Sequence, residues 1–95
     1  DDFDSFILDL PSAPAPEALM SRVTEALGLD GVLRIKGVVE IDGKDARHVI
    51  QGVGPRVDGF YDRPWGAKET RQSRLVVIGL KGIDPTAIET VLRPS

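Results

Sequence analysis

Apolar residues in this sequence repeat with two different periods, and this change of period constrains the fold more than any other feature. They alternate with polar residues in "GVLRIKGVVEI", residues 31–41, whereas after Pro16 they recur at every third or fourth position. Alternation is typical of a strand with one buried face, and the longer spacing is typical of a helix with one apolar stripe. Because each apolar face must be buried against another element, we predict a two-layer α+β sandwich.

The predicted elements follow one another in the order β-α-β-β-β-α. Strands are expected over residues 3–10, 31–41, 47–54 and 74–80, and helices over 16–27 and from Pro85 onward. Alternation places Leu33 with Ile35 and Val39 on the buried face of the second strand, and Asp42-Gly43 is typical of a tight type I′ hairpin turn. Segment 59–72 lacks a period, so we predict a long loop there. The expected sheet is therefore four-stranded and mainly antiparallel, with both helices on one face.

Length and composition limit the class of protein. Ninety-five residues suit a single domain covering residues 1–95. No apolar run approaches the roughly 18 residues that a membrane span needs, so no membrane partner is expected. The chain contains no cysteine, which favours the cytoplasm and excludes thiolate metal sites and cysteine nucleophiles. Because it begins with Asp1-Asp2 and no initiator methionine, we expect it to be a fragment of a longer protein.

Charge is distributed unevenly along the chain. Residues 1–30 carry seven acidic side chains and one arginine, whereas residues 31–74 carry nine basic and six acidic ones, within a net charge of −3. Nucleic-acid binding usually requires a strongly basic stripe and a high isoelectric point. A modest basic segment on an acidic protein instead predicts pairing with acidic groups of a protein partner, and no nucleic acid.

Few residues suit catalysis or the binding of a metal or cofactor. No phosphate-binding glycine pattern is present, and we predict no catalytic, cofactor-binding or metal residue and no enzyme activity in this chain. His48 is the sole imidazole, whereas a zinc or cobalt site needs three or four ligands. One alternative stays open, a direct cobalt or zinc module in which His48 acts with Asp1, Asp2 and Asp4. Otherwise His48 is expected to face solvent or an interface near a hairpin.

Segment 54–74, "GPRVDGFYDRPWGAKETRQSR", holds the only tryptophan and the only tyrosine. Arginine, tryptophan and tyrosine are enriched in protein interfaces. We therefore predict an interaction surface with six members: Arg56, Tyr61, Arg63, Trp65, Arg71 and Arg74. The alternative has equal weight: Trp65 folds back as a lid over an open sheet edge, while Arg63 or Arg74 pairs with Asp58 or Asp62.

Three stretches, "VLRIKGVV", "VIQGVGPRVDGFYDRPWG" and "SRLVVIGLKGID", occur in the order found in a known family. Together they resemble the C-terminal domain of the CobW family of GTP-dependent metallochaperones, most closely the members linked to cobalamin biosynthesis. The resemblance extends from "DDFDSFILDLP" to the final helix.

The resemblance implies a parent protein with an N-terminal GTPase domain that uses GTP, magnesium and cobalt or zinc. The motifs for those functions do not occur in these 95 residues. The implied role is thus a non-catalytic accessory and regulatory domain in cobalt delivery for cobalamin biosynthesis. The implied partners are the parent's own GTPase domain and a client, the cobaltochelatase or another metalloprotein.

Overall fold

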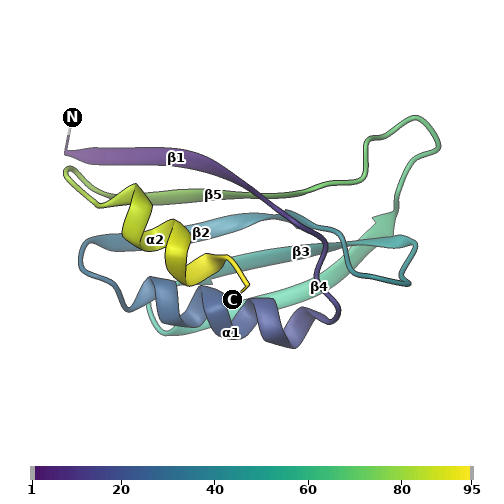
Figure 1. Cartoon of the computed structure of the whole chain (residues 1–95), viewed down its shortest axis with the longest axis horizontal. Helices are drawn as coiled ribbons and strands as arrows, with labels where there is room; N and C mark the ends of the chain where they lie inside the picture. The colour runs from purple at the N-terminus through teal and green to yellow at the C-terminus, as the bar shows by residue number, and fades with distance from the viewer. Residues whose placement is uncertain (1, 95) are drawn as a thin grey trace.

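One antiparallel sheet and two helices make up the fold. A computed structural model describes residues 2–94. The elements in chain order are β1 Phe3–Leu10, α1 Pro16–Leu27, β2 Val32–Val39, β3 Ala46–Val53, β4 Arg56–Pro64, β5 Ser73–Leu80 and α2 Pro85–Leu92. The strands lie in the order β1-β5-β2-β3-β4, and each neighbouring pair is antiparallel. Both helices lie on the same side of the sheet (Figure 1). The predicted α+β class with helices on one face is confirmed.

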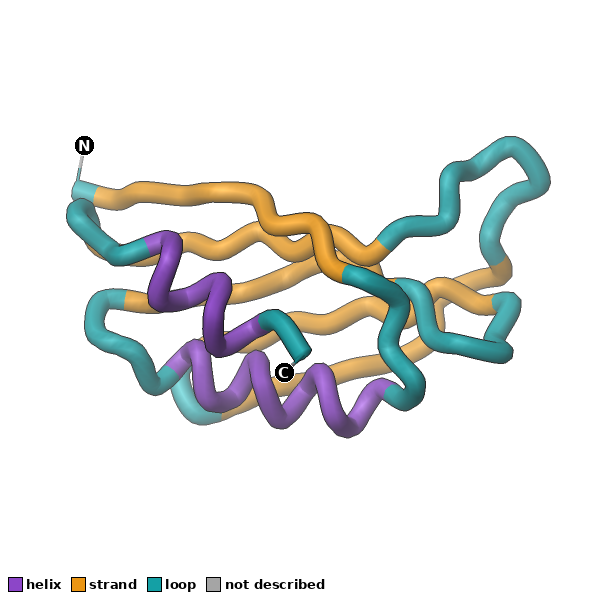
Figure 2. The backbone as a smooth tube through the Cα atoms, in the orientation of Figure 1, coloured by secondary structure: helices purple, strands orange, loops and turns teal. Residues whose placement is uncertain are grey.

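The sheet has five strands, so the prediction of four strands is wrong. The segment expected to be a loop over 59–72 starts inside β4, which pairs with β3 along most of its length (Figure 2). Gly54 and Pro55 form the two-residue turn before it, with Val53 paired to Arg56 and Gly54 at a φ of 58°. Glycine with positive φ at the first turn position is a hairpin signal. The true connection to β5 is residues 65–72.

A bulge in β2 shifts which residues are buried. The register against β5 changes between Val32 and Arg34. Val32 is consequently buried, and Leu33 is 39% exposed. The prediction that Leu33 shares the buried face is therefore wrong, whereas Ile35 and Val39 are buried as predicted. A one-residue register change moves a side chain to the opposite face of a strand.

The turn between β2 and β3 is longer than predicted. The last paired residues are Val39 and His48, and Gly43 has a φ of 75° while Asp42 is not in the positive-φ region. A type I′ turn needs positive φ at both central residues, so that prediction is wrong. Residues after β2 pair instead with the proline-rich connector, where the Asp42 N–H donates to the Ala13 carbonyl at 2.8 Å.

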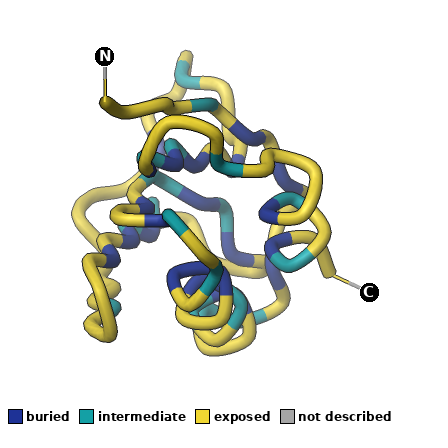
Figure 3. The backbone as a smooth tube through the Cα atoms, turned by 90° about the vertical axis from the view of Figure 1, so that its left-hand side faces the viewer, coloured by how far each residue is buried: buried dark blue, intermediate teal, exposed yellow. Residues whose placement is uncertain are grey.

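The core lies between the helices and one face of the sheet. The largest fully buried side chains are Leu19, Ile35, Ile41, Ile50, Leu75, Ile88 and Leu92. In Figure 3 the buried positions gather where helices and strands face one another. The two helices also contact each other, and the Arg22 Nε donates to the Leu92 carbonyl at 2.9 Å.

Both helices begin as the sequence predicts. Each has proline in its first turn, and Asp84 caps α2 because its carboxylate accepts the backbone N–H groups of Thr86 and Ala87 at 3.1 and 3.2 Å. Capping of this kind satisfies donors that have no partner inside the helix. Within residues 2–94, neither helix has the length and apolar character that crossing a membrane would require.

Candidate interaction surface

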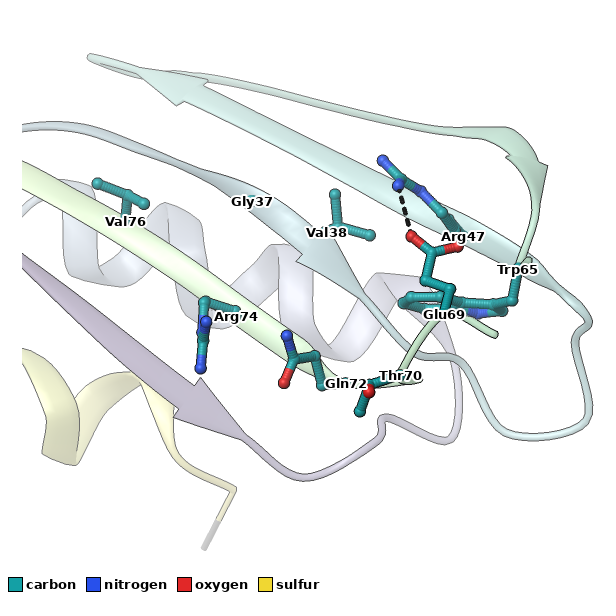
Figure 4. Close-up of a pocket in the computed structure, with 9 residues that line it drawn as sticks. All are labelled: Gly37, Val38, Arg47, Trp65, Glu69, Thr70, Gln72, Arg74 and Val76. Carbon is teal, nitrogen blue, oxygen red and sulfur yellow. Dashed lines mark hydrogen bonds and ion pairs between the residues drawn. The ribbon is translucent and has the colours of Figure 1, made fainter. Parts of the chain in front are cut away.

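The structure divides the six residues of the predicted interaction surface among three places. Arg63, Trp65 and Arg71 lie in or beside connection 65–72, and Arg74 lies near the start of β5. Trp65 and Arg74 line the same surface hollow, which Figure 4 shows in close-up. These four residues therefore occur together at one end of the sheet.

The other two members lie elsewhere. Arg56 begins β4 at the opposite end of that strand and forms an ion pair with Asp58 at 3.2 Å. Tyr61 pairs in register with His48, and the two rings pack edge to face with centroids 4.9 Å apart. Sequence proximity therefore overstates the clustering, because a strand places its two ends far apart.

Glu69 organises connection 65–72. Its two carboxylate oxygens accept hydrogen bonds from Arg63 at 2.8 and 2.9 Å, from Arg47 at 3.0 Å and from the Gly66 N–H at 2.9 Å. These donors stabilise the charged carboxylate and lower the pKa of Glu69 to about 2, and Glu69 in turn raises the pKa of Arg63. Glu69 therefore stays ionised and fixes the loop to β3 and β4.

Trp65 is buried beneath this cluster. It is 7% exposed, its backbone N–H donates to the Asp45 carbonyl at 2.9 Å, and the Arg47 guanidinium lies 6.0 Å from its ring centroid. That distance is the outer limit of a cation–π contact. Its indole Nε1 has no hydrogen-bond partner among residues 2–94. In Figure 4 the ring lies under the Glu69 side chain.

The remaining arginines of the predicted surface are also paired. Arg74 donates to both carboxylate oxygens of Asp9, at 2.7 and 3.1 Å, and Arg71 pairs with Asp45. The contact lowers the pKa of Asp9 and raises that of Arg74. Neither Arg63 nor Arg74 pairs with Asp58 or Asp62, so the partners predicted for the lid arrangement are wrong. Much of the positive charge of segment 54–74 is thus neutralised by the chain itself.

His48 is buried, which corrects the expectation that it faces solvent or an interface. It is 3% exposed on the helix side of β3, and its Nδ1 has no hydrogen-bond partner within the described chain. A Cβ atom on Gly59 would lie 2.6 Å from the His48 ring and 2.8 Å from the Met20 sulfur, so the glycine makes room for both. Burial lowers the pKa of His48, and Glu17 opposes that effect.

The structure does not bring His48 together with the N-terminal aspartates. Asp4 lies on β1 and pairs with Gly79 of β5. His48 lies on β3, and two strands, β5 and β2, separate β1 from β3. The Asp4 carboxylate accepts the Gly82 N–H at 2.9 Å. Asp1 lies outside the described residues. Between residues 2 and 94, no three His, Cys, Asp or Glu side chains gather as a metal site would require, so the residues present do not fit a bound zinc or cobalt ion.

We expect protein stability to fall as pH drops below about 6.5, the ordinary pKa of histidine. The folded state lowers the His48 pKa, so between the two pKa values the unfolded chain binds more protons and stability declines by up to about 1.4 kcal/mol per pH unit. His48→Phe keeps a ring against Tyr61 and removes the titrating group. Urea unfolding at several pH values should show a flatter profile for the variant.

The carboxylates supply a separate control for this prediction. Asp9 and Glu69 have lowered pKa values, so their contributions are present above their ordinary pKa values of 3.8 and 4.5 and are lost below them. Both variant and wild type should therefore lose stability in that more acidic range. An unchanged slope between about pH 5 and 6.5 in His48→Phe would assign the effect to other groups.

The sheet face that points away from the helices, here called the open face, is the part of the surface that sequence reasoning missed. Ile7 is paired across strands with Val76, Val76 with Lys36, and Val38 with Val49. These positions alternate with buried residues of the core. The alternation of "GVLRIKGVVEI" predicts which residues of β2 face the core, but it gives no sign that neighbouring strands add apolar residues to the other face.

Comparison with known proteins gives consistent matches over nearly the whole chain. Residues 3–94 match the family described as the cobalamin synthesis protein cobW C-terminal domain. A zinc chaperone CobW from Sinorhizobium sp is 45% identical over 92 residues, 97% of this chain and 26% of the relative. A zinc chaperone CobW from Pseudomonas aeruginosa is 46% identical over 89 residues, 94% of this chain and 23% of the relative.

A solved structure agrees with these sequence matches. The Zn(II)-bound YjiA GTPase from E. coli is 28% identical and superposes with a TM-score of 0.75 over 96% of this chain and 29% of the solved chain. The chain thus spans about a quarter of the length of the curated relatives it matches. The five-stranded arrangement is shared with a domain that forms part of a larger GTPase.

Proposed function

Because this chain belongs to the family of CobW C-terminal domains, we propose that it is the non-catalytic accessory domain of a CobW-type GTPase metallochaperone. The observation that supports this most directly is the family match over residues 3–94, joined to relatives named as zinc chaperones. GTP and magnesium would be bound by the part of such a protein that lies outside the match. The domain itself would act through binding.

Two partners follow from this proposal: the parent's own GTPase domain and a metal-receiving client protein. Binding and release of GTP next to this domain would change its orientation and so alter access to the client. A coupling free energy of about 1–3 kcal/mol between the two sites would be enough for such a switch. The support from this chain is an exposed sheet face that carries both apolar and cationic side chains, as an interaction domain requires.

The proposed cargo is zinc, with cobalt as the second candidate. The names of the matched relatives and of the solved GTPase refer to zinc, and the family description refers to cobalamin synthesis, which favours cobalt and a cobaltochelatase client. In either case the ion is cargo of the whole protein. No residue of this domain is assigned to hold it.

Deleting this domain from the longer GTPase tests the proposed function. We expect basal GTP hydrolysis to persist and GTP-dependent transfer of zinc to the client to fall by about 5- to 150-fold, the range that corresponds to that coupling. The isolated domain should hydrolyse no GTP. The same transfer assay with Co²⁺ in place of Zn²⁺ separates the two cargoes.

Two results would contradict the proposal. Zinc transfer that is unchanged by the deletion would exclude a recognition role. GTP hydrolysis by the purified 95-residue chain would exclude a non-catalytic one. Adding the separate domain back to the deleted protein is the control for general damage to the remaining part.

A further inference from the structure

The open face carries an apolar band to which all five strands contribute. Val76 and Val38 are diagonal neighbours in it, because Val76 pairs with Lys36 and Val38 pairs with Arg74. Cross-strand pairing joins Phe3 to Leu80, Ile7 to Val76, Val38 to Val49 and Val49 to Phe60. The full band is Phe3, Leu80, Ile78, Ile7, Val76, Val38, Val49 and Phe60. The outer face of an antiparallel sheet with helices on its other side is normally polar. A band of this kind indicates a surface that is covered when the protein acts.

The side chains at the two ends of the band are well exposed. Ile7 is 62% exposed, Phe3 57%, and Phe60 and Leu80 each 49%. Both helices lie on the opposite side of the sheet (Figure 2). None of the elements between residues 2 and 94 therefore covers this face.

Two adjoining hollows in the open face give the band a place for inserted side chains. One of about 540 Å³ lies beside connection 65–72, and a second of about 230 Å³ lies over β2 and β3. They share Gly37, Val38 and Val76 as lining residues. Figure 4 shows Val38 and Val76 on neighbouring strands beside the first hollow. Apolar pockets at the centre of an exposed patch are typical anchor points for a partner's large side chains.

The charge on this face is opposite in sign to that of the protein. Its strand positions hold five cations, Arg34, Lys36, Arg47, Arg56 and Arg74, against three carboxylates, Asp9, Asp58 and Asp62, a net of +2 on a chain of net −3. Arg47, Arg56 and Arg74 pair with those carboxylates. Arg34 and Lys36, in the middle of the sheet, form no ion pair with any residue between Asp2 and Pro94.

We propose that the open face binds an amphipathic, acidic α-helix of a partner protein, with its apolar stripe on the band and its carboxylates beside Arg34 and Lys36. Charge complementarity selects the acidic partner. Size selects the helix, because five strands about 4.8 Å apart span about 19 Å, and a helix about 10 Å across fits on that width. An extended segment would add to a sheet edge rather than lie across a face.

Other occupants fit the face less well. The two phenylalanines of the band lie on opposite edge strands, Phe3 on β1 and Phe60 on β4, so they do not make the adjacent stacking platform that single-stranded nucleic acid uses. A second copy of the same chain would bring two faces of net +2 together. This proposal rests on the proposed function and names the chemistry of the client that the domain would bind. Because the peptide experiment uses the isolated chain, its result is independent of the zinc-transfer test of the proposed function.

The experiment uses two synthetic peptides of about 18 residues, five helical turns, with leucines on one stripe. One carries glutamates on its flanks and the other carries lysines at the same positions. Binding is measured by isothermal titration calorimetry, and shifts of ¹⁵N-labelled protein locate the contact. We expect the glutamate peptide to bind, to shift signals of β2, β3 and β5, and to bind more weakly as salt rises.

Charge variants test whether peptide binding depends on the open face or only on the overall charge of the protein. The double variant Arg34→Glu with Lys36→Glu should weaken the glutamate peptide by about tenfold and prefer the lysine peptide. The matched control, Lys44→Glu with Lys81→Glu, makes the same charge change at exposed turns and should leave binding unchanged. Ile7→Gln, at the most exposed apolar position, should weaken both peptides without unfolding the protein.

Four results of the binding measurements would overturn the proposal. They are absence of binding up to about 1 mM peptide, a contact mapped to α1 or α2, equal weakening by the control pair, and tighter binding of single-stranded DNA than of the glutamate peptide. Sedimentation of the chain without peptide tests the remaining alternative, in which a second copy of the chain binds the open face. A dimer that Ile7→Gln dissociates would assign the open face to a second copy and likewise overturn the proposal.

Discussion

Gly37→Ala is expected to destabilise the domain by more than about 4 kcal/mol, which is exceptional for one added methyl group. A Cβ atom at Gly37 would lie 2.0 Å from the Arg74 carbonyl oxygen and 2.9 Å from the Leu75 Cα. Both are backbone atoms of β5, which pairs with β2 at this point. Because a backbone cannot rotate away as a side chain does, the two strands would have to separate. Urea unfolding followed by circular dichroism measures the loss.

The size of this effect follows from the position of β2 and β5 in the sheet. β5 lies between β1 and β2, so separating β2 from β5 divides the sheet into a pair and a three-stranded part. The core residues Ile35 and Leu75 lie on either side of that division and are fully buried. Domains of this size have a total stability of roughly 5–15 kcal/mol, so much of the variant should be unfolded at 37 °C.

Gly66→Ala is the matched control. The nearest atom to a Cβ at Gly66 is the Glu69 Cβ at 3.4 Å, an ordinary van der Waals distance. The variant should change stability by no more than about 0.5 kcal/mol, as is usual for surface positions. If Gly37→Ala unfolded at the same urea concentration as Gly66→Ala, the close approach of β2 and β5 would not constrain this position.

The helices and four of the strands were predictable because each buries one face against the core. Leu19 and Val23 in α1 and Ile88 and Leu92 in α2 are buried at the spacing that their sequence shows. β4 was missed for a physical reason. It is an edge strand, most of its residues are exposed, and Gly59 replaces the side chain that would meet His48. No apolar alternation marks such a strand, although the Gly54-Pro55 turn before it was a signal.

The candidate surface was less predictable than the fold because its contacts join residues that are distant in sequence. Arg74 pairs with Asp9, 65 residues away, and Arg47 pairs with Glu69, 22 residues away. Sequence proximity instead suggested Asp58 and Asp62 as partners of the arginines. The open face has the same difficulty, since β1, β5 and β2 each contribute only a few of its residues. Their order in the sheet, which the sequence does not state, brings them together.

Trp65→Ala is expected to lower the free energy of unfolding by about 3 kcal/mol, the lower end of the range for buried aromatic residues. The side chain is buried but lies at the edge of the sheet, where one side borders the open hollow. Its removal also leaves Arg47 and Glu69 without the surface on which they pack. Hydrogen exchange of connection 65–72 should therefore accelerate more than exchange of the core strands.

Trp65→Phe separates the role of the ring from that of the indole N–H. The buried Nε1 has no partner within residues 2–94, so phenylalanine removes a donor whose burial is itself unfavourable. The free energy gained by removing this donor offsets part of the loss from the smaller ring, so the free energy of unfolding should change by less than about 1 kcal/mol. A loss in Trp65→Phe as large as that in Trp65→Ala would mean that the N–H is bonded in solution. In that case the stability of connection 65–72 would depend on a polar contact of Trp65 rather than on its packing.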